Sequence, residues 1–265
     1  MAIDYIIDYP CPPKEKLGTE GIVERLKGQE RAEVIIQLFR DNGDERPPSQ
    51  MGFEFTRATP DGEDENTVII VQDLLDEAAE LEPLAHHCQG CPANRTGKPF
   101  GCVGFIQYPI TEAGEQWLLD RLPVPDEPLI WLLLRQGMRE FKYDGETVAP
   151  LRANASNYFE SADVQSRLLG ELSVNANQIF EMIFAVGHII PNHAALLLLF
   201  FNAIPRDLEA QDIMSITPAS EDARTKHPFT IEFDSSDDRS VAEFKQFLYA
   251  LYLAWTLNVR LLVDA

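Results

Sequence analysis

The sequence predicts an α+β protein with small mixed sheets and several helices. Its N-terminal half is predicted to be stapled by a metal, and its mostly helical C-terminal half to end in a β-α-β unit. Three observations lead to this prediction. Helix-like and strand-like segments follow one another without the regular alternation of a parallel α/β fold. Three of the four cysteines cluster within residues 88–102. The proline-rich stretch 122–128 forms a stiff connection, which predicts two domains, 1–124 and 125–265.

The first domain is predicted from the apolar spacing along the chain. A period near 3.6 residues indicates a helix, and alternation indicates a strand. Gly28 and Gly43 stand where a helix would end on a left-handed residue. The turn-forming stretch 59–62 is predicted to join two strands as a hairpin. The predicted strands are 3–9, 51–56, 67–71 and 103–108, and the predicted helices are 19–27, 30–40, 72–81 and 111–122.

The second domain is predicted in the same way. Its final element is a strand–helix–strand unit, in which Ser240 and Glu243 have the spacing of a capping box at the start of the helix. Residues 217–228 are polar and aperiodic, which predicts a loop. The predicted helices before that loop are 128–141, 161–169, 173–188 and 192–203, and the final strands are 229–233 and 259–263.

The charge balance narrows the classes of partner. The chain has 43 acidic and 22 basic residues, a formal net charge of −21. Nucleic acids and anionic lipids attract clustered Lys and Arg, so this balance argues against both and favours another protein as partner. The most apolar stretches, 194–204 and 247–257, are shorter than the roughly 20 residues that span a bilayer. The N-terminus lacks the basic region of a signal peptide, so a cytoplasmic location is expected.

The cysteine cluster is the strongest functional signal in the sequence. A reducing compartment keeps thiols unpaired, so a C-x2-C-x10-C pattern there is typical of a metal site. Cys88 and Cys91 are predicted to lie on one tight turn, in which Gly90 adopts a positive φ. Cys102 is predicted to lie at the start of the next strand. The intervening loop is poor in apolar side chains, so a metal is expected to supply its stability.

The fourth ligand is left open by the sequence. A structural zinc site needs four ligands, and Cys11 is the first choice because it lies in a proline-rich loop. His86 is the alternative, because His87 is adjacent to Cys88 and would strain a shared site. If neither joins, the fourth position is open to water and the site could be catalytic. An iron–sulfur cluster would use the same four cysteines. Without a metal, they are buried small apolar groups.

Two other groups of residues are candidates. Arg95 and Lys98 make the cysteine loop locally basic, so it could bind an anion or an acidic partner. Alternatively, both side chains are simply solvated. Glu181, His188 and His193 could form a metal or acid–base site, or a proline-bent corner between helices. The acidic runs 61–65 and 234–238 lack EF-hand spacing and are expected to be a hairpin tip and a helix lead-in.

The function expected from these observations is a non-catalytic interaction or regulatory protein with a structural zinc site. The sequence contains no G-x-S-x-G, Rossmann or His-Glu-x-x-His motif. An iron–sulfur redox protein built on the same cysteines is one alternative. A metal-dependent enzyme with an open zinc position is the other.

Overall fold

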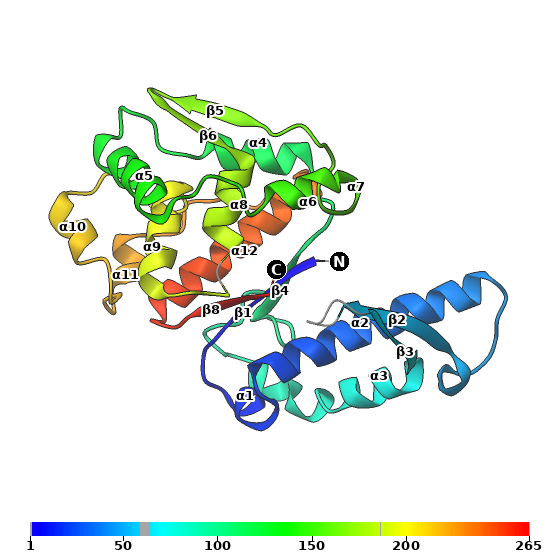
Figure 1. Ribbon diagram of the computed structural model, residues 1–265. Helices are drawn as coiled ribbons and strands as arrows, with labels where there is room; N and C mark the ends of the chain where they lie inside the picture. Colours follow the sequence, from blue (N-terminus) through cyan, green and yellow to red (C-terminus); the bar gives the residue numbers. More distant parts are fainter. Residues whose placement is uncertain (1, 59–63, 186, 265) are drawn as a thin grey trace. The chain divides into compact units, whose positions relative to one another are not determined.

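The computed structural model describes residues 2–58, 64–185 and 187–264 (Figure 1). The chain divides into two compact units, which are described separately. The sheet unit comprises Met1–Tyr9, Pro92–Gly97 and Gly101–Ala265, and the helix unit comprises Pro10–Cys91 and Lys98–Phe100. Helices combine with small antiparallel sheets, which confirms the predicted α+β class. These two units do not coincide with the predicted domains 1–124 and 125–265. One sheet joins strands from both ends of the chain, so the sheet unit includes residues from both predicted domains.

The sheet unit is built on an antiparallel sheet of four strands in the order β4-β1-β8-β7. The strands are β1 (Ala2–Ile7), β4 (Val103–Gln107), β7 (His188–Ile189) and β8 (Leu261–Asp264). Five successive residues of β1 are buried, so both of its faces are covered. Tyr5 of β1 pairs with Gly104 on one side and with Val263 on the other. A separate hairpin consists of β5 (Ser166–Leu169) and β6 (Leu172–Asn175).

Helices cover this sheet, and α12 is the central one. It packs against β1, β4, α4 and α9. Trp255 of α12 is fully buried, and its Nε1 donates a hydrogen bond to the carbonyl of Ile216 at 2.9 Å. Helix α9 is mostly buried, as its continuous apolar sequence predicts. The helices of the sheet unit are α4 (Glu112–Asp120), α5 (Pro128–Phe141), α6 (Ala149–Ala153), α7 (Ala155–Tyr158), α8 (Ala176–Phe184), α9 (Pro191–Phe200), α10 (Ala210–Met214), α11 (Ala223–Lys226) and α12 (Arg239–Thr256).

The helix unit packs the long helix α2 against α3. Its elements are α1 (Pro12–Leu17), α2 (Thr19–Asp41), η1 (Pro48–Gln50), β2 (Gly52–Ala58), β3 (Asp64–Ile70), α3 (Val71–Ala79) and η2 (Glu82–Cys88). A small apolar cluster is centred on Ala32, Met51 and Val71. Strands β2 and β3 pair antiparallel, which confirms the predicted hairpin. Its predicted turn at 59–62 and most of the acidic run 61–65 lie outside the described residues.

The two helices predicted at 19–27 and 30–40 are one continuous helix, α2. Gly28, predicted to end the first of them, is instead a buried interior residue that faces α3. A Cβ at this position would lie 3.6 Å from Cδ2 of Leu74. Gly28 therefore lies at the contact between α2 and α3 and does not end a helix. Gly43 has a φ of +76°, which confirms the predicted left-handed residue beyond the helix end.

The predicted β-α-β unit at the C-terminus is wrong in its first strand. Residues 229–233 have no strand partner in the described part of the chain. Their alternating apolar side chains pack on α12 instead, with the ring of Phe229 5.2 Å from that of Tyr249. The helix is capped by Asp238, whose Oδ1 accepts a hydrogen bond from the Ser240 N–H at 2.9 Å. The predicted helix 161–169 is also wrong, because its second half forms β5.

Candidate metal centre

Two of the predicted ligands are brought to neighbouring elements of the helix unit. Cys11 immediately precedes α1, whose first residues are Pro12 and Pro13. Cys88 is the last residue of η2. Because α1 packs against η2, the proline-rich loop and the end of η2 approach each other. The exposed His86 and His87 belong to the same short helix.

The turn from Cys88 to Cys91 has the predicted geometry. The Cys91 N–H donates to the Cys88 carbonyl at 3.3 Å. Gln89 has φ −69° and ψ 122°, and Gly90 has a φ of +73°. These values define a type II turn, which needs a positive φ at its third residue. Any L side chain at position 90 would strain the turn, so the prediction for Gly90 is confirmed.

A strained residue donates a hydrogen bond to the first thiol of this turn. The Phe100 N–H lies 3.1 Å from Sγ of Cys88, and both residues are buried. Phe100 has a φ of +55°, a left-handed conformation that costs free energy for a bulky side chain. Hydrogen bonds to sulfur favour its charged form, so this N–H suits a thiolate better than a thiol.

The three thiols of the helix unit interact electrostatically. Burial raises the pKa of the Cys88 thiol, while the hydrogen bond from Phe100 lowers it. Negative charge on Cys11 or Cys91 raises the same pKa further, because like charges repel. Such repulsion acts only over short distances in salt solution. Cys11 and Cys91 therefore influence the ionisation of Cys88, and a bound cation would relieve the repulsion between the thiolates.

Cys102 belongs to the sheet unit, where it directly precedes β4. It is buried, and its carbonyl accepts a hydrogen bond from the Ile7 N–H at 3.1 Å. All four cysteines are described, and no disulfide joins them. Within residues 2–58, 64–185 and 187–264, no three His, Cys, Asp or Glu side chains converge as a ready-made metal site. The predicted metal staple therefore stays a prediction.

The loop before Cys102 has supports other than a metal. Oδ1 of Asn94 accepts a hydrogen bond from the Gly97 N–H at 3.0 Å, and the Arg95 N–H donates to the Gly101 carbonyl at 3.1 Å. A Cβ at Gly101 would overlap the side chains of Asn94 and Thr96. These hydrogen bonds hold part of the loop by themselves, and the contribution of a metal to its stability stays a prediction.

Arg95 is neither a solvated side chain nor an available anion ligand. Its guanidinium donates to the Val103 carbonyl at 2.6 Å and to Oε1 of Gln246 at 2.8 Å. It also lies over the ring of Tyr5, 5.3 Å from the centroid. These contacts tie the loop to the sheet and to α12. The neighbouring cation, Lys98, is exposed.

The structure does not bring Glu181, His188 and His193 together as a site. The buried carboxylate of Glu181 accepts hydrogen bonds from the Gly145 N–H at 2.7 Å and the Thr147 hydroxyl at 2.5 Å. His188 is exposed in β7. His193 lies in the first turn of α9, where burial lowers its pKa. These contacts favour the structural interpretation, in which Glu181 anchors the loop before α6.

Sequence reasoning missed a buried ion pair in the sheet unit. The guanidinium of Arg152 lies 2.5 Å from Oε1 of Glu115 and also donates to Oδ1 of Asn177 at 3.0 Å. Burial raises the pKa of Glu115, and Arg152 opposes that effect. The available signal was that Glu115 shares a helix face with the apolar Leu118 and Leu119.

No family model, curated protein or solved structure matches this chain. Among the helices of the described residues, none is long and apolar enough to cross a membrane.

Proposed function

We propose that this chain binds one metal ion through Cys11, Cys88 and Cys91, and that the metal-bound loop serves protein interaction or regulation. Zinc is the first choice of metal. The sequence adds Cys102 as a further ligand and gives His86 as the alternative to Cys11. The observation that carries the proposal is the hydrogen bond from the strained Phe100 N–H to Cys88 Sγ.

The strain at Phe100 supports a functional purpose for this contact. A left-handed backbone at a bulky residue persists only where the surroundings compensate for it, and such residues concentrate at functional sites. Its N–H points at a sulfur that is the first member of a C-x2-C turn. An N–H that stabilises a thiolate also stabilises a metal thiolate, since bound cysteine is deprotonated.

Metal binding would require the thiols to turn onto a common point. Cysteine has a single χ1 torsion, so staggered rotamers give each sulfur a few alternative positions. Binding would release protons from the thiols, so the affinity for zinc is expected to rise with pH. The ion would attract each thiolate, and this attraction would offset the repulsion that raises the pKa of Cys88.

The choice among metals follows from the ligand set. Four thiolates suit tetrahedral zinc, and they are also the usual complement of an iron–sulfur cluster. Proline follows both Cys11 and Cys91, a feature also found in ferredoxin-like runs, which keeps the cluster as the alternative. If only three cysteines bind, water completes the coordination, and a metal-dependent enzyme becomes the alternative function.

Anaerobic purification followed by elemental analysis and an absorption spectrum tests the proposal. Colourless protein with about one zinc per chain supports it. Brown protein with iron and sulfide replaces zinc with a cluster. Protein without metal that also fails to take up added zinc contradicts the proposal.

Cobalt(II) substitution then counts the thiolate ligands, because tetrahedral cobalt thiolates have characteristic visible and near-ultraviolet bands. Cys11→Ser and Cys102→Ser should each weaken binding and reduce the sulfur-to-cobalt charge-transfer band. His86→Asn and His87→Asn form a matched pair on η2. A loss with His86→Asn alone assigns His86 as the ligand in place of one cysteine.

A further inference from the structure

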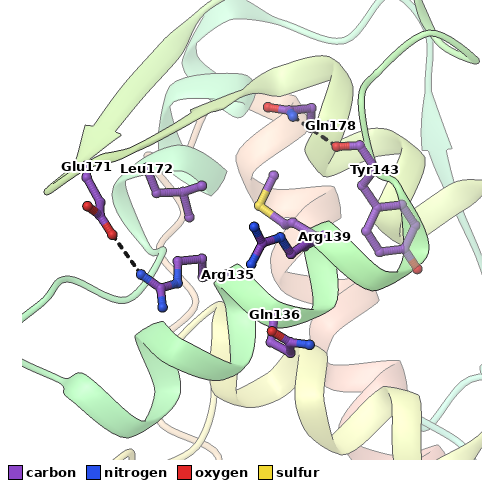
Figure 2. A pocket seen from close by; sticks show the side chains of 8 residues that line it. Arg135, Gln136, Arg139, Tyr143, Glu171, Leu172 and Gln178 are labelled. Atoms are coloured by element: carbon purple, nitrogen blue, oxygen red, sulfur yellow. Dashed lines mark hydrogen bonds and ion pairs between the residues drawn. The ribbon is translucent and has the colours of Figure 1, made fainter.

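A second candidate site lies in the sheet unit, at a pocket of about 490 Å³. Helix α5 forms one wall, and the β5–β6 turn and the start of α8 form the other (Figure 2). The volume lies within the range of small-molecule sites in proteins. The pocket contains none of the cysteines, so it is independent of the proposed metal site.

Two arginines give this pocket a positive wall. Arg135 and Arg139 are one helical turn apart on α5 and project from the same face (Figure 2). Arg135 donates to Oε1 of Glu171 at 2.7 Å and lies over the Trp131 ring, 4.8 Å from its centroid. Arg139 is exposed and forms no ion pair with any residue in the described ranges. The residues that line the pocket thus carry two cations and one anion, Glu171, in a chain whose net charge is −21.

The rest of the pocket is fixed and partly apolar. Nε2 of Gln178 donates to the Tyr143 carbonyl at 2.9 Å, and Oε1 of Gln178 accepts from the Asn175 N–H at 3.0 Å. These bonds hold Gln178 and the chain at Tyr143 in place. Tyr143 also lines the pocket, and burial raises the pKa of its phenol. Leu172 adds an apolar surface.

We propose that this pocket binds a small phosphate monoester. Its phosphate would lie on Arg135 and Arg139, and its organic part against Leu172 and Tyr143. Guanidinium groups pair with phosphate through forked, charge-assisted hydrogen bonds, and a tetrahedral phosphate offers enough oxygens for two such groups. A dianion would also compete with the Glu171 carboxylate for Arg135.

Calorimetric titration of the full chain tests this at constant ionic strength, with phenyl phosphate, inorganic phosphate and benzoate as probes. Phenyl phosphate is expected to bind most tightly, because it alone supplies both the phosphate and the apolar part. Tighter binding of benzoate would overturn the assignment to phosphate. No heat from any probe at millimolar concentration would overturn the site.

Three variants separate this pocket from general charge effects. Arg139→Gln should raise the Kd for phenyl phosphate about tenfold, the usual consequence of losing one charge-assisted hydrogen bond. Glu171→Gln should lower the Kd, because it releases Arg135 for the ligand. Arg224→Gln, which removes the same charge on α11, should leave the Kd unchanged. Equal losses in the two arginine variants would overturn the proposal, and so would an unchanged Kd in Arg139→Gln with a native circular dichroism spectrum.

Discussion

The sheet unit and the helix unit are stabilised in different ways. The sheet unit contains all three tryptophans, a strand buried on both faces and a central helix with twelve buried residues. The helix unit contains no tryptophan or tyrosine, and its apolar cluster centres on three buried residues. Apolar burial scales with the size of a core, so the helix unit has less of it to offset its conformational entropy. A bound metal would therefore add most to the stability of the helix unit.

The ion pairs differ in the same direction. Arg152 and Glu115 of the sheet unit pair with side chains only 5% and 2% exposed. Arg25 and Glu80 of the helix unit pair at the surface, with side chains 21% and 53% exposed. A buried charge is costly without its partner, whereas an exposed pair contributes little. The Arg152–Glu115 pair therefore constrains the interior of the sheet unit, whereas the Arg25–Glu80 pair is expected to contribute little to the stability of the helix unit.

The largest effect is expected from breaking the buried pair. Arg152→Met should lower the free energy of unfolding of the sheet unit by about 3–5 kcal/mol, because it leaves Glu115 buried without a cation. Urea unfolding followed by tryptophan fluorescence measures this, since every tryptophan lies in the sheet unit. The double variant Arg152→Met/Glu115→Leu should recover most of the loss. A single variant as stable as the original chain would contradict the role given to the pair.

Metal should act chiefly on the helix unit, which contains three of the four proposed cysteine ligands. Zinc at a free concentration of a hundred times its Kd should stabilise the helix unit by about 2.7 kcal/mol. Hydrogen exchange read by mass spectrometry should show this as slower exchange in α1 and η2, with α12 unchanged. If zinc slowed hydrogen exchange equally in both units, the expected difference between the two units would be contradicted. The Cys88→Ser variant is the control, and it should show no protection.

A smaller effect tests the packing of α2. Gly28→Ala should stabilise the helix unit by up to about 1 kcal/mol, because alanine favours a helix interior and its Cβ would meet Leu74 at an ordinary contact distance of 3.6 Å. Gly43→Ala should destabilise it, since position 43 has a φ of +76°. Circular dichroism during thermal unfolding measures both. If Gly28→Ala destabilised the helix unit, the result would favour a left-handed residue at position 28, as the sequence predicted for a helix end.

The smallest effect concerns pH. Burial lowers the pKa of His193, so below about pH 6.5 the unfolded chain takes up a proton that the folded chain resists. The free energy of unfolding should therefore fall as the pH drops from 6.5 toward the folded pKa, and stay level above 6.5 as far as His193 contributes. Urea midpoints at pH 5.5 and 7.5 measure this for the sheet unit. His193→Asn should reduce the difference, and an equal difference in that variant would contradict the assignment.

Much of the local structure was predictable because local rules decide it. Strand β1, the β2–β3 hairpin, α5, α9 and the Gly90 turn follow from periodicity and turn chemistry. The strand prediction failed for a segment whose alternating apolar side chains pack on a helix and not in a sheet. Residues 229–233 alternate as a strand does, yet their side chains pack on α12. Periodicity shows which side chains are buried, and it does not show what buries them.

In the candidate metal centre, too, some features follow from the sequence and others from the tertiary structure. The C-x2-C turn is a property of four neighbouring residues, so the sequence alone determined it. Only the tertiary structure decided that Cys11 influences the ionisation of Cys88, that the Phe100 N–H points at Cys88 Sγ, and that Arg95 donates to the Val103 carbonyl. These contacts join residues far apart in the chain. Their positions depend on packing over the whole unit, which residue spacing does not encode.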